Sequence, residues 1–547
     1  MILLKLLKKS LQPQSYFLFF IIIFGYILLN LNFLASDKDL FLFFSQHYKK
    51  NWFSLQDLHL GGITYLNAYP PLVFQIMALL LFVISDLKLA YTFIMLIFWI
   101  LLTFYASKTC LLNFNLKDKY FKFIFLLIFF SIGLFRAVLV YGWLTFIAGL
   151  SFVFMSWYYF YLFLKNKEKS KLSFILPAIL AGFANIYAFI ILIGIFVFVA
   201  IANYNLILKK IQFRYLLMFL LIMLLAYFFA FLYLNEKFIN YVEVFHKSRN
   251  PLETENINLW FYTIYGLELS MVAIFLLYRP LHRYWKLYAL SIIFLLIGLG
   301  RTTPLAQFIF GNLEKVLTFD RFLTFSAILL TWFFGVFIVT IIKNFRESLQ
   351  SKILIAIFFI YLSFNLTEIL MHYDDPLFRT EGKEEAKNFV LGFLNNHSIQ
   401  YRYQTLGYPG LIGDFYLYTK MPTTDTDFIS FSNIEFVKSA GIRQINLITD
   451  ETLLSSFFND SSKYSVKYVI TFDGFYVKFT KEQNWKVIEN KTFGNFNVVI
   501  WENPNKIEPI KPTQEKITLF NYLWGTVPLS TLFLFIFMLA YRKFYKS

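Results

Sequence analysis

Cysteine and charge are both scarce in this 547-residue chain. The single cysteine, Cys110, excludes an internal disulfide framework and any metal site built from several thiolates. Only 15% of the residues are charged, whereas 58% are hydrophobic, and soluble globular proteins carry a clearly smaller apolar fraction. The composition therefore predicts a membrane protein.

The hydrophobic residues form long runs without polar alternation. Runs of roughly 18 to 25 apolar residues are long enough to cross a hydrocarbon core of about 30 Å as helices, whereas the strands of a porin-like barrel would alternate. The apolar segments fall near residues 15–35, 70–85, 89–107, 121–135, 143–164, 172–184, 187–205, 213–234, 258–278, 284–299, 322–342, 353–370 and 517–541. The predicted fold is mostly α, a polytopic transmembrane helical bundle.

Basic residues outnumber acidic ones, which gives a formal net charge of +17. Because charges are rare overall, the lysines and arginines must lie in short loops and tails, a distribution that suits anionic lipid headgroups. Nucleic acid is the other common partner of a basic chain. No basic groove with interleaved recognition motifs is present, so we expect membrane lipids as partners and no nucleic acid.

The basic residues also predict an orientation, because Lys and Arg in short loops favour the cytoplasm. In the second half of the chain they all fall on one side. This distribution predicts a cell-membrane protein with residues 372–516 outside the cell and the C-terminus in the cytoplasm. The lysines at the start and in 165–171 also favour the cytoplasm, yet five segments separate them where an even number is required. Either residues 69–107 cross differently from a hairpin, or the region around Arg136 contains a re-entrant piece. With a cytoplasmic N-terminus, 11 or 13 crossings must precede the outer domain.

Three parts follow along the chain: a transmembrane domain at 1–371, a small extracytoplasmic α/β domain at 372–516, and a C-terminal transmembrane helix with a basic tail at 517–547. In the middle part, apolar residues at i, i+3, i+4, i+7 and i+8 predict a helix over 381–395. Two β-branched runs, at 466–471 and 497–501, predict strands.

Ionisable side chains gather in the first outer loop, residues 35–72. Asp37 and Asp39 stand where the first helix leaves the membrane, where a carboxylate can take a proton from an incoming hydroxyl or amide. The alternative is a solvated helix terminus. Asp57 and His59, two positions apart, can face one ligand if the backbone is extended. With Asp37, Asp39 and His47 they also suit a divalent cation such as Mg²⁺ or Mn²⁺, although the spacing fixes no geometry.

Arginines near apolar segments are the second set of candidates. Arg136 lies between two such segments, where a guanidinium needs a partner and a phosphate is a natural one; the alternative is an anchor that reaches the interface. Arg301 and Arg321 bracket one outer loop, so that their guanidiniums can clamp a lipid-linked phosphate. Asp320-Arg321 can equally be an ion pair at a helix start.

Several motifs resemble a known class. The acidic residues after the first span, followed by Trp52, Gly61-Gly62 and Tyr69-Pro70-Pro71-Leu72, resemble the first outer loop of the GT-C class of membrane glycosyltransferases. Later motifs are similar to its branch labelled 6-pyruvoyl-tetrahydropterin synthase-related membrane proteins, a label that implies no pterin chemistry. These motifs are Gly300-Arg301-Thr302-Thr303-Pro304, Asp320-Arg321-Phe322, Tyr401-Arg402-Tyr403 and Val466-Lys467-Tyr468-Val469-Ile470. The chain lacks the Asp-Glu or Glu-Asp pair of better-known members and has no WWDYG-like motif.

The resemblance implies transfer of a sugar from a polyprenyl-phosphate donor to a glycan, lipid or protein acceptor on the extracytoplasmic face. Asp39 or Asp37 is then the general base, and arginines stabilise the leaving lipid phosphate. The residues expected to bind substrate are Asp57, His59, Arg136, Arg301, Asp320 and Arg321. Two alternatives remain: a non-catalytic carrier or flippase partner that binds lipid-linked glycan through the same arginines, and a structural envelope protein.

Overall fold

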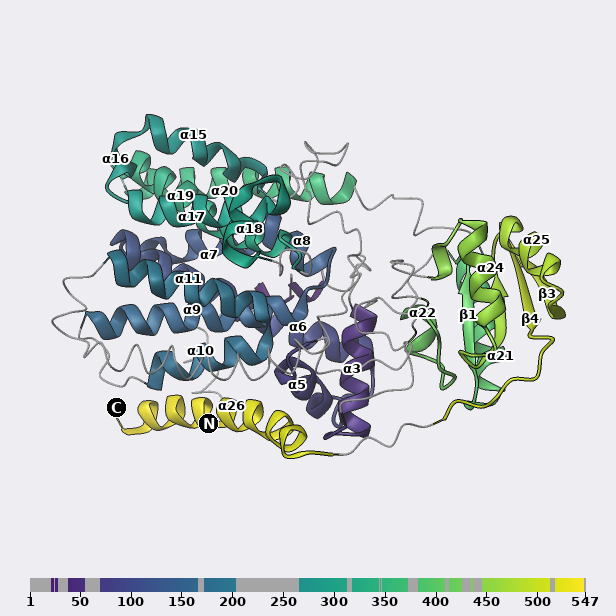
Figure 1. Cartoon of the computed structure of the whole chain (residues 1–547). Helices are drawn as coiled ribbons and strands as arrows, with labels where there is room; N and C mark the ends of the chain where they lie inside the picture. The colour runs from purple at the N-terminus through teal and green to yellow at the C-terminus, as the bar shows by residue number, and fades with distance from the viewer. Residues whose placement is uncertain are drawn as a thin grey trace, which may run out of the picture.

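The structure is a computed structural model that describes a helical bundle and a small α/β unit at one end of it (Figure 1). The described residues are 21–23, 25–27, 38–54, 69–165, 172–202, 265–311, 317–343, 345, 347–371, 382–408, 413–425, 434, 436, 445–511 and 517–545. Five described helices are long and apolar enough to cross a membrane. They are α6 (Leu87–Phe114), α9 (Leu144–Leu164), α19 (Asp320–Ile342), α20 (Glu347–Met371) and α26 (Leu519–Tyr545). The predicted, mostly helical membrane protein is confirmed at this level.

Shorter apolar helices complete the described bundle. They are α10 (Leu172–Ala184), α11 (Ile186–Ala202), α15 (Ser270–Leu277) and α17 (Trp285–Gly298). The buried core between them is rich in aromatic rings, for example Trp99 stacked on Phe129 with centroids 4.0 Å apart. Aromatic side chains therefore fill much of the space between helices.

The segment expected to cross at 70–85 is shorter than the sequence suggests. It forms α5 (Leu72–Leu80), which has nine residues. At 1.5 Å per residue such a helix is about 14 Å long, roughly half the hydrocarbon thickness. The nine-residue helix agrees with the alternative that residues 69–107 cross differently from a hairpin, because the apolar run continues past the end of its helix into the turn before α6.

A second irregularity lies near Arg136, where α7 (Phe121–Phe129) and α8 (Ile132–Leu139) meet at 54°. A helix break leaves backbone carbonyls without intrahelical donors, and side chains must supply them. Ser131 Oγ donates to Ile128 O at 3.0 Å, and Asn365 Nδ2 from α20 donates to Phe130 O at 2.7 Å. The break is thus tied to a neighbouring span.

The C-terminal helix α26 contacts the N-terminal part of the chain at the backbone carbonyls that precede its proline. Pro528 has no N–H, so the carbonyl of Trp524 four residues earlier loses its helical donor. Gln75 Nε2 of α5 donates to Trp524 O and to Gly525 O, both at 3.1 Å, and Trp52 Nε1 donates to Gly525 O at 2.9 Å. Residues more than 440 positions apart are joined at this kink.

The α/β unit, residues 382–511, is built on a four-stranded sheet in the order β1-β2-β4-β3. The strands are β1 (Arg402–Leu406), β2 (Val466–Thr471), β3 (Lys486–Phe493) and β4 (Phe496–Glu502). Strand β1 pairs parallel with β2, and the other two pairings are antiparallel. The helix predicted at 381–395 is α21 (Lys383–Asn395), and the two predicted strands are β2 and the inner part of β4.

Helices cover both faces of this sheet, as the alternation of strand side chains requires. Tyr468 and Ile470 of β2 pack with α21, whereas Val469 packs on the opposite face with α24 (Glu451–Asp460) and α25 (Gly474–Glu482). The unit therefore has a core of its own on each side of the sheet.

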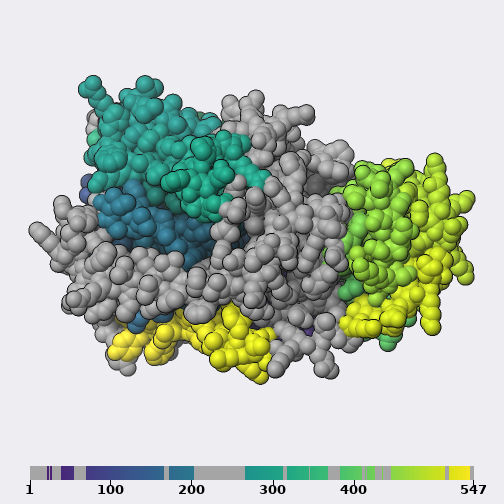
Figure 2. All heavy atoms as spheres, in the orientation of Figure 1, coloured from purple at the N-terminus to yellow at the C-terminus, as the bar shows by residue number. Residues whose placement is uncertain are grey.

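One helix of the bundle touches the α/β unit directly. Helix α3 (Lys38–Lys50) lies against α22 (Gly413–Tyr416), with the Phe43 and Tyr416 rings edge to face at 5.2 Å. Figure 2 shows the α/β unit at one end of the molecule and part of α26 along the lower edge of the bundle.

Candidate functional site

The first turn of α19 holds a nearly buried ion pair. Arg321 Nη1 lies 2.9 Å from Asp320 Oδ1, and the side chains are only 12% and 9% exposed. The same carboxylate oxygen accepts the backbone N–H of Arg321 at 3.0 Å. The ion-pair alternative for Asp320-Arg321 is thus the geometry that the structure has.

Two aromatic rings lie against the Arg321 guanidinium. Its central carbon is 4.6 Å from the ring centroid of Trp143 and 5.0 Å from that of Tyr187. Tyr141 in turn stacks on Trp143 at 4.7 Å and 15°. A guanidinium between aromatic faces is held in one plane, and arginine suits such a place better than lysine because it is planar and more weakly hydrated.

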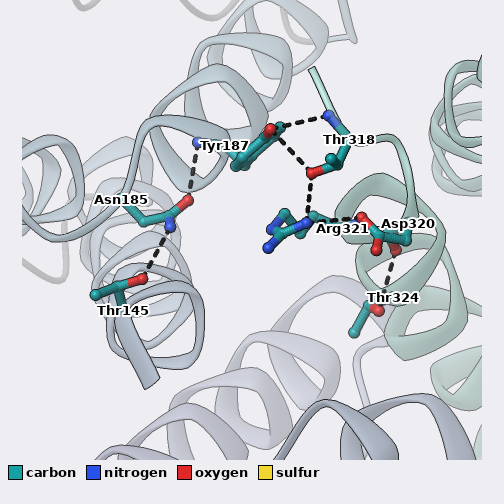
Figure 3. A network of polar contacts seen from close by, with 7 residues as sticks. All are labelled: Thr145, Asn185, Tyr187, Thr318, Asp320, Arg321 and Thr324. Atoms are coloured by element: carbon teal, nitrogen blue, oxygen red, sulfur yellow. Dashed lines mark hydrogen bonds and ion pairs between the residues drawn. The ribbon is translucent and has the colours of Figure 1, made fainter. Parts of the chain in front are cut away.

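Tyr187 and Thr318 complete the polar contacts around Arg321 (Figure 3). Thr318 N donates to Tyr187 OH at 2.9 Å, the two hydroxyl oxygens are 3.0 Å apart, and Arg321 Nη1 also donates to Thr318 Oγ1. Each hydroxyl carries one hydrogen, and only one of the two is used between them. Within the described residues, the other hydrogen of this pair is left for a further acceptor.

Tyr187 is placed by the junction between α10 and α11. Asn185 Oδ1 accepts from Tyr187 N at 2.9 Å and from Ala188 N at 3.3 Å, which caps the start of α11. Asn185 Nδ2 donates to Thr145 Oγ1 at 3.2 Å, which ties the junction to α9 (Figure 3). Tyr187 is thus fixed by this cap and is also a wall of the site.

Arg136 joins the same region through Tyr141. The Arg136 side chain is buried on α8, and Tyr141 interacts with both Arg136 and Asp320. Burial raises the pKa of the Tyr141 hydroxyl, Asp320 acts in the same direction, and Arg136 opposes them. The phenol therefore keeps its proton at neutral pH and can donate it in a hydrogen bond.

We call this arrangement the Arg321 cluster; it consists of Arg136, Tyr141, Trp143, Tyr187, Thr318, Asp320 and Arg321. Two guanidiniums and one carboxylate give it one net positive charge. Its hydroxyl groups, on Tyr141, Tyr187 and Thr318, carry hydrogens that can be donated in hydrogen bonds. A region of low dielectric with this charge favours an anion as its ligand.

Arg301 lies in the short turn η4 (Gly300–Thr302) at the end of α17. This turn runs close to the start of α19, because a Cβ on Gly298 would lie 2.4 Å from Leu323 Cδ2 and 2.9 Å from Leu323 N. Arg301 and Arg321 thus belong to neighbouring turns at the same end of two packed helices. The prediction that they bracket one loop fits this arrangement.

Asp39 occupies a different place. It lies in the first turn of α3 and touches the α/β unit, since a Cβ on Gly413 would lie 2.5 Å from Asp39 Cβ and 3.1 Å from its Oδ2. In Figure 1, α3 lies beside α5 in the lower part of the bundle, whereas α8 and α18 lie in its upper part. The predicted base and the Arg321 cluster therefore come from different parts of the bundle.

Asp37, Asp57 and His59 lie outside the described residues, so the structure does not place them. Within the part of the chain that it does describe, no three His, Cys, Asp or Glu side chains are grouped as a metal site would require. The alternative of a divalent cation in the first outer loop stays a prediction.

Sequence reasoning found the charged members of the cluster and missed the aromatic and hydroxyl ones. Trp143 carries no local signal, because Trp, Tyr and Phe make up 22% of the chain. A glycine does mark the turn that places Trp143: Gly142 has a φ of +64°, and its carbonyl accepts from Tyr91 OH at 2.9 Å. Comparison with known proteins adds no further assignment: no protein-family model matches the chain, and no curated protein matches it.

Proposed function

We propose that this chain is a membrane glycosyltransferase of the GT-C type, which moves a sugar from a polyprenyl-phosphate donor to a glycan, lipid or protein acceptor. The observation that carries the proposal is the Arg321 cluster, a buried group with one net positive charge inside an apolar bundle. A lipid-linked phosphate is an anion that the membrane itself delivers. Its phosphate is also the leaving group of the transfer, so the same guanidiniums that bind it stabilise the charge that develops.

Hydrogen-bond geometry supports phosphate over a carboxylate ligand. Arg321 already shares one nitrogen between Asp320 and Thr318, and the Tyr187–Thr318 pair has a hydroxyl hydrogen left over. Phosphate offers several acceptor oxygens at different angles, so it can meet a guanidinium and a hydroxyl at once. Arg301 belongs to the neighbouring turn η4, and Arg136 is connected to the cluster through Tyr141.

The short α5 supports the proposed orientation. Without a crossing at 70–85, four apolar segments separate the two lysine groups of the first half, an even number that puts both in the cytoplasm. Eleven segments then precede residue 372, and in this proposal the α/β unit lies outside. The basic α16 (Arg279–His282) and the C-terminus lie at the end of the bundle far from that unit (Figure 1).

In this proposal Asp39 is the general base and the α/β unit presents the acceptor. Asp39 lies where α3 meets α22, so an acceptor held by the α/β unit reaches this carboxylate first. The donor phosphate would be bound by the Arg321 cluster. The sugar must then bridge the two places, a geometry that requires the acceptor and the donor together.

A second candidate function follows from the separation of Asp39 from the cluster. A carrier or flippase partner for lipid-linked glycan needs the phosphate site and no base. The packing of Asp39 against Gly413 fits this reading as a contact between the bundle and the α/β unit.

Purified protein given a radiolabelled polyprenyl-phosphate sugar separates the two functions. The transferase predicts label in an acceptor, reduced at least a hundredfold in Asp39→Asn or Asp37→Asn, with donor binding retained in both. Binding without turnover in the unaltered protein would instead establish the carrier. Turnover that survives both substitutions would remove the base assignment, and absence of donor binding would remove both functions.

A further inference from the structure

A carboxyl that the proposed function does not use lies inside the bundle. Glu268, in η3 (Gly266–Leu269), is 1% exposed, and its Oε1 accepts from the hydroxyls of Thr331, at 3.2 Å, and Tyr361. Thr331 stands about 16 Å along α19 from its first residue, near the middle of a candidate span. An ionisable group at that depth is costly to keep and marks a functional site by default.

The hydrogen-bond donors around Glu268 do not satisfy a full negative charge. Thr331 Oγ1 has one hydrogen and lies within reach of Ala327 O at 2.9 Å as well as Glu268 Oε1. Tyr361 is then the firm side-chain donor to this carboxylate, and the backbone N–H of Glu268 itself also acts on it. The other oxygen, Oε2, accepts no hydrogen bond from the described residues. A carboxylate in an apolar interior needs more than one donor on one of its oxygens.

The side-chain oxygen of Asn365, one helical turn after Tyr361 on α20, is a second buried oxygen without a donor in the described part of the chain. Asn365 follows Tyr361 by four positions on α20, so the two share a helix face. Its side chain is 1% exposed, and its Nδ2 donates to Phe130 O at 2.7 Å. Its Oδ1 is buried without a hydrogen-bond donor among the described residues. Buried amide oxygens normally have one.

Both oxygens lie beside the break between α7 and α8. Asn365 reaches it through Phe130, the residue that ends α7. Glu268 reaches it through Gly266, whose φ is +49°; a Cβ there would lie 3.4 Å from Glu268 Oε2 and 2.9 Å from Ile132, the first residue of α8. The missing side chain at Gly266 leaves room next to Oε2.

We propose that Glu268 and Asn365 form an intramembrane site for a small monovalent cation, a proton or Na⁺, next to the break between α7 and α8. Either cation bonds to the lone pairs of oxygen atoms, and either cancels the charge of the carboxylate. Discontinuous helices with buried carboxyl and carbonyl oxygens at mid-membrane are where membrane proteins place such ions.

The charged and titratable groups around Glu268 decide whether the protein itself balances its negative charge. Tyr361 of α20 faces Glu268 directly, and Tyr265 precedes the same turn with its hydroxyl near Ser326 of α19. Arg136, the basic residue of α8, interacts with Tyr141 in the Arg321 cluster. Among the described residues, the groups that act on Glu268 include no Lys or Arg, and in this proposal the proton or Na⁺ supplies the positive charge there.

Two measurements on the full-length protein in detergent distinguish the cations. In the first, NaCl replaces choline chloride at constant ionic strength and pH 8; a Na⁺ site predicts a saturable rise in Tm of several degrees, which KCl does not give. In the second, infrared spectra are recorded without Na⁺; a proton site predicts a protonated-carboxyl C=O band at neutral pH.

Glu268→Gln must abolish whichever signal is present, and Asn365→Leu must weaken the Na⁺ response at least tenfold in concentration. Glu347→Gln is the matched control, because it removes a carboxylate from the exposed start of α20 and should change neither signal. If Glu268→Gln does not fold, Tyr361→Phe must shift the band frequency or the Na⁺ midpoint. The unaltered protein showing neither signal, or Glu268→Gln retaining it, overturns the site.

Discussion

At the scale of single residues, Arg321 combines contacts that no other side chain can make together. Its guanidinium lies between the rings of Trp143 and Tyr187 while one nitrogen contacts Asp320 and Thr318. Stacking uses the flat face of the group, and hydrogen bonding uses its edge. Shape as well as charge should therefore decide ligand binding here.

Arg321→Lys keeps the charge and removes the planar fork. We expect the dissociation constant for a polyprenyl phosphate to rise about tenfold or more, corresponding to about 1.4 kcal/mol, as measured by equilibrium binding in detergent. Arg283→Lys is the matched control, since Arg283 also stacks on a ring, 4.5 Å from the Tyr284 centroid, at the opposite end of α17 from Arg301. Equal weakening by both substitutions would show that Arg321 has no special part in binding.

Tyr187→Phe tests the hydroxyl rather than the ring. The substitution leaves the stacking on Arg321 and removes the acceptor of Thr318 N, which should cost about 1 kcal/mol of stability for this part-buried donor. Binding of the lipid phosphate should weaken as well, because the spare hydroxyl hydrogen is gone.

The control for this change is Tyr284→Phe, which also removes a part-buried hydroxyl, one that donates to Phe114 O at 2.9 Å. It should lower Tm by a comparable amount and leave lipid binding unchanged. If Tyr284→Phe weakens lipid binding as much as Tyr187→Phe does, the effect belongs to general stability and not to the site.

At the scale of helices, the kink of α26 depends on donors from elsewhere in the chain. Gln75→Leu removes the donor to Trp524 O, which Pro528 cannot replace. We expect a loss of about 1–3 kcal/mol in the free energy of unfolding, measured by thermal or denaturant unfolding in detergent. Gln307→Leu, an exposed position on α18 (Pro304–Phe310), should cost less than half of that. A Gln75 variant as stable as the control would contradict this role.

The sequence predicted the long helices well and the irregular ones poorly, for a physical reason. An uninterrupted apolar run such as 143–164 has one stable state in lipid, a helix, and α9 has nearly these bounds. The ends of α5 and the break at Ser131 depend on neighbours far away in the chain, such as Asn365. In the sheet, β1 was missed because Arg402–Leu406 alternates weakly and gains its order from pairing with β2.

The candidate site divides in the same way. Charged residues in an apolar chain are conspicuous, so Arg136, Asp320 and Arg321 could be singled out from composition alone. Their aromatic walls come from the starts of α9 and α11, and nothing in the local sequence connects these with α19. Tertiary contacts of this kind require the fold.

At the scale of the whole molecule, the bundle and the α/β unit come very close where α22 meets α3. Gly413→Ala would place a methyl group 2.5 Å from Asp39 Cβ, so α22 and α3 must move apart. We expect faster amide hydrogen exchange in α3 and a destabilisation of about 1–3 kcal/mol, typical of overpacking. Gly392→Ala on α21 has nothing within 4 Å and should leave α3 unchanged. Unchanged exchange in α3 for Gly413→Ala would contradict this contact.

The ties from Gln75 and Trp52 to the kink in α26 also bear on biogenesis. Ribosomes and the insertion machinery deliver α3 and α5 long before the helix that completes them exists, so the early segments must wait in the bilayer with these donors unused. A protein interrupted during synthesis after residue 511 would contain every other described element and still lack the hydrogen bonds from Gln75 and Trp52 to α26. Quality-control proteases that survey membranes would have a simple means of telling finished molecules from unfinished ones.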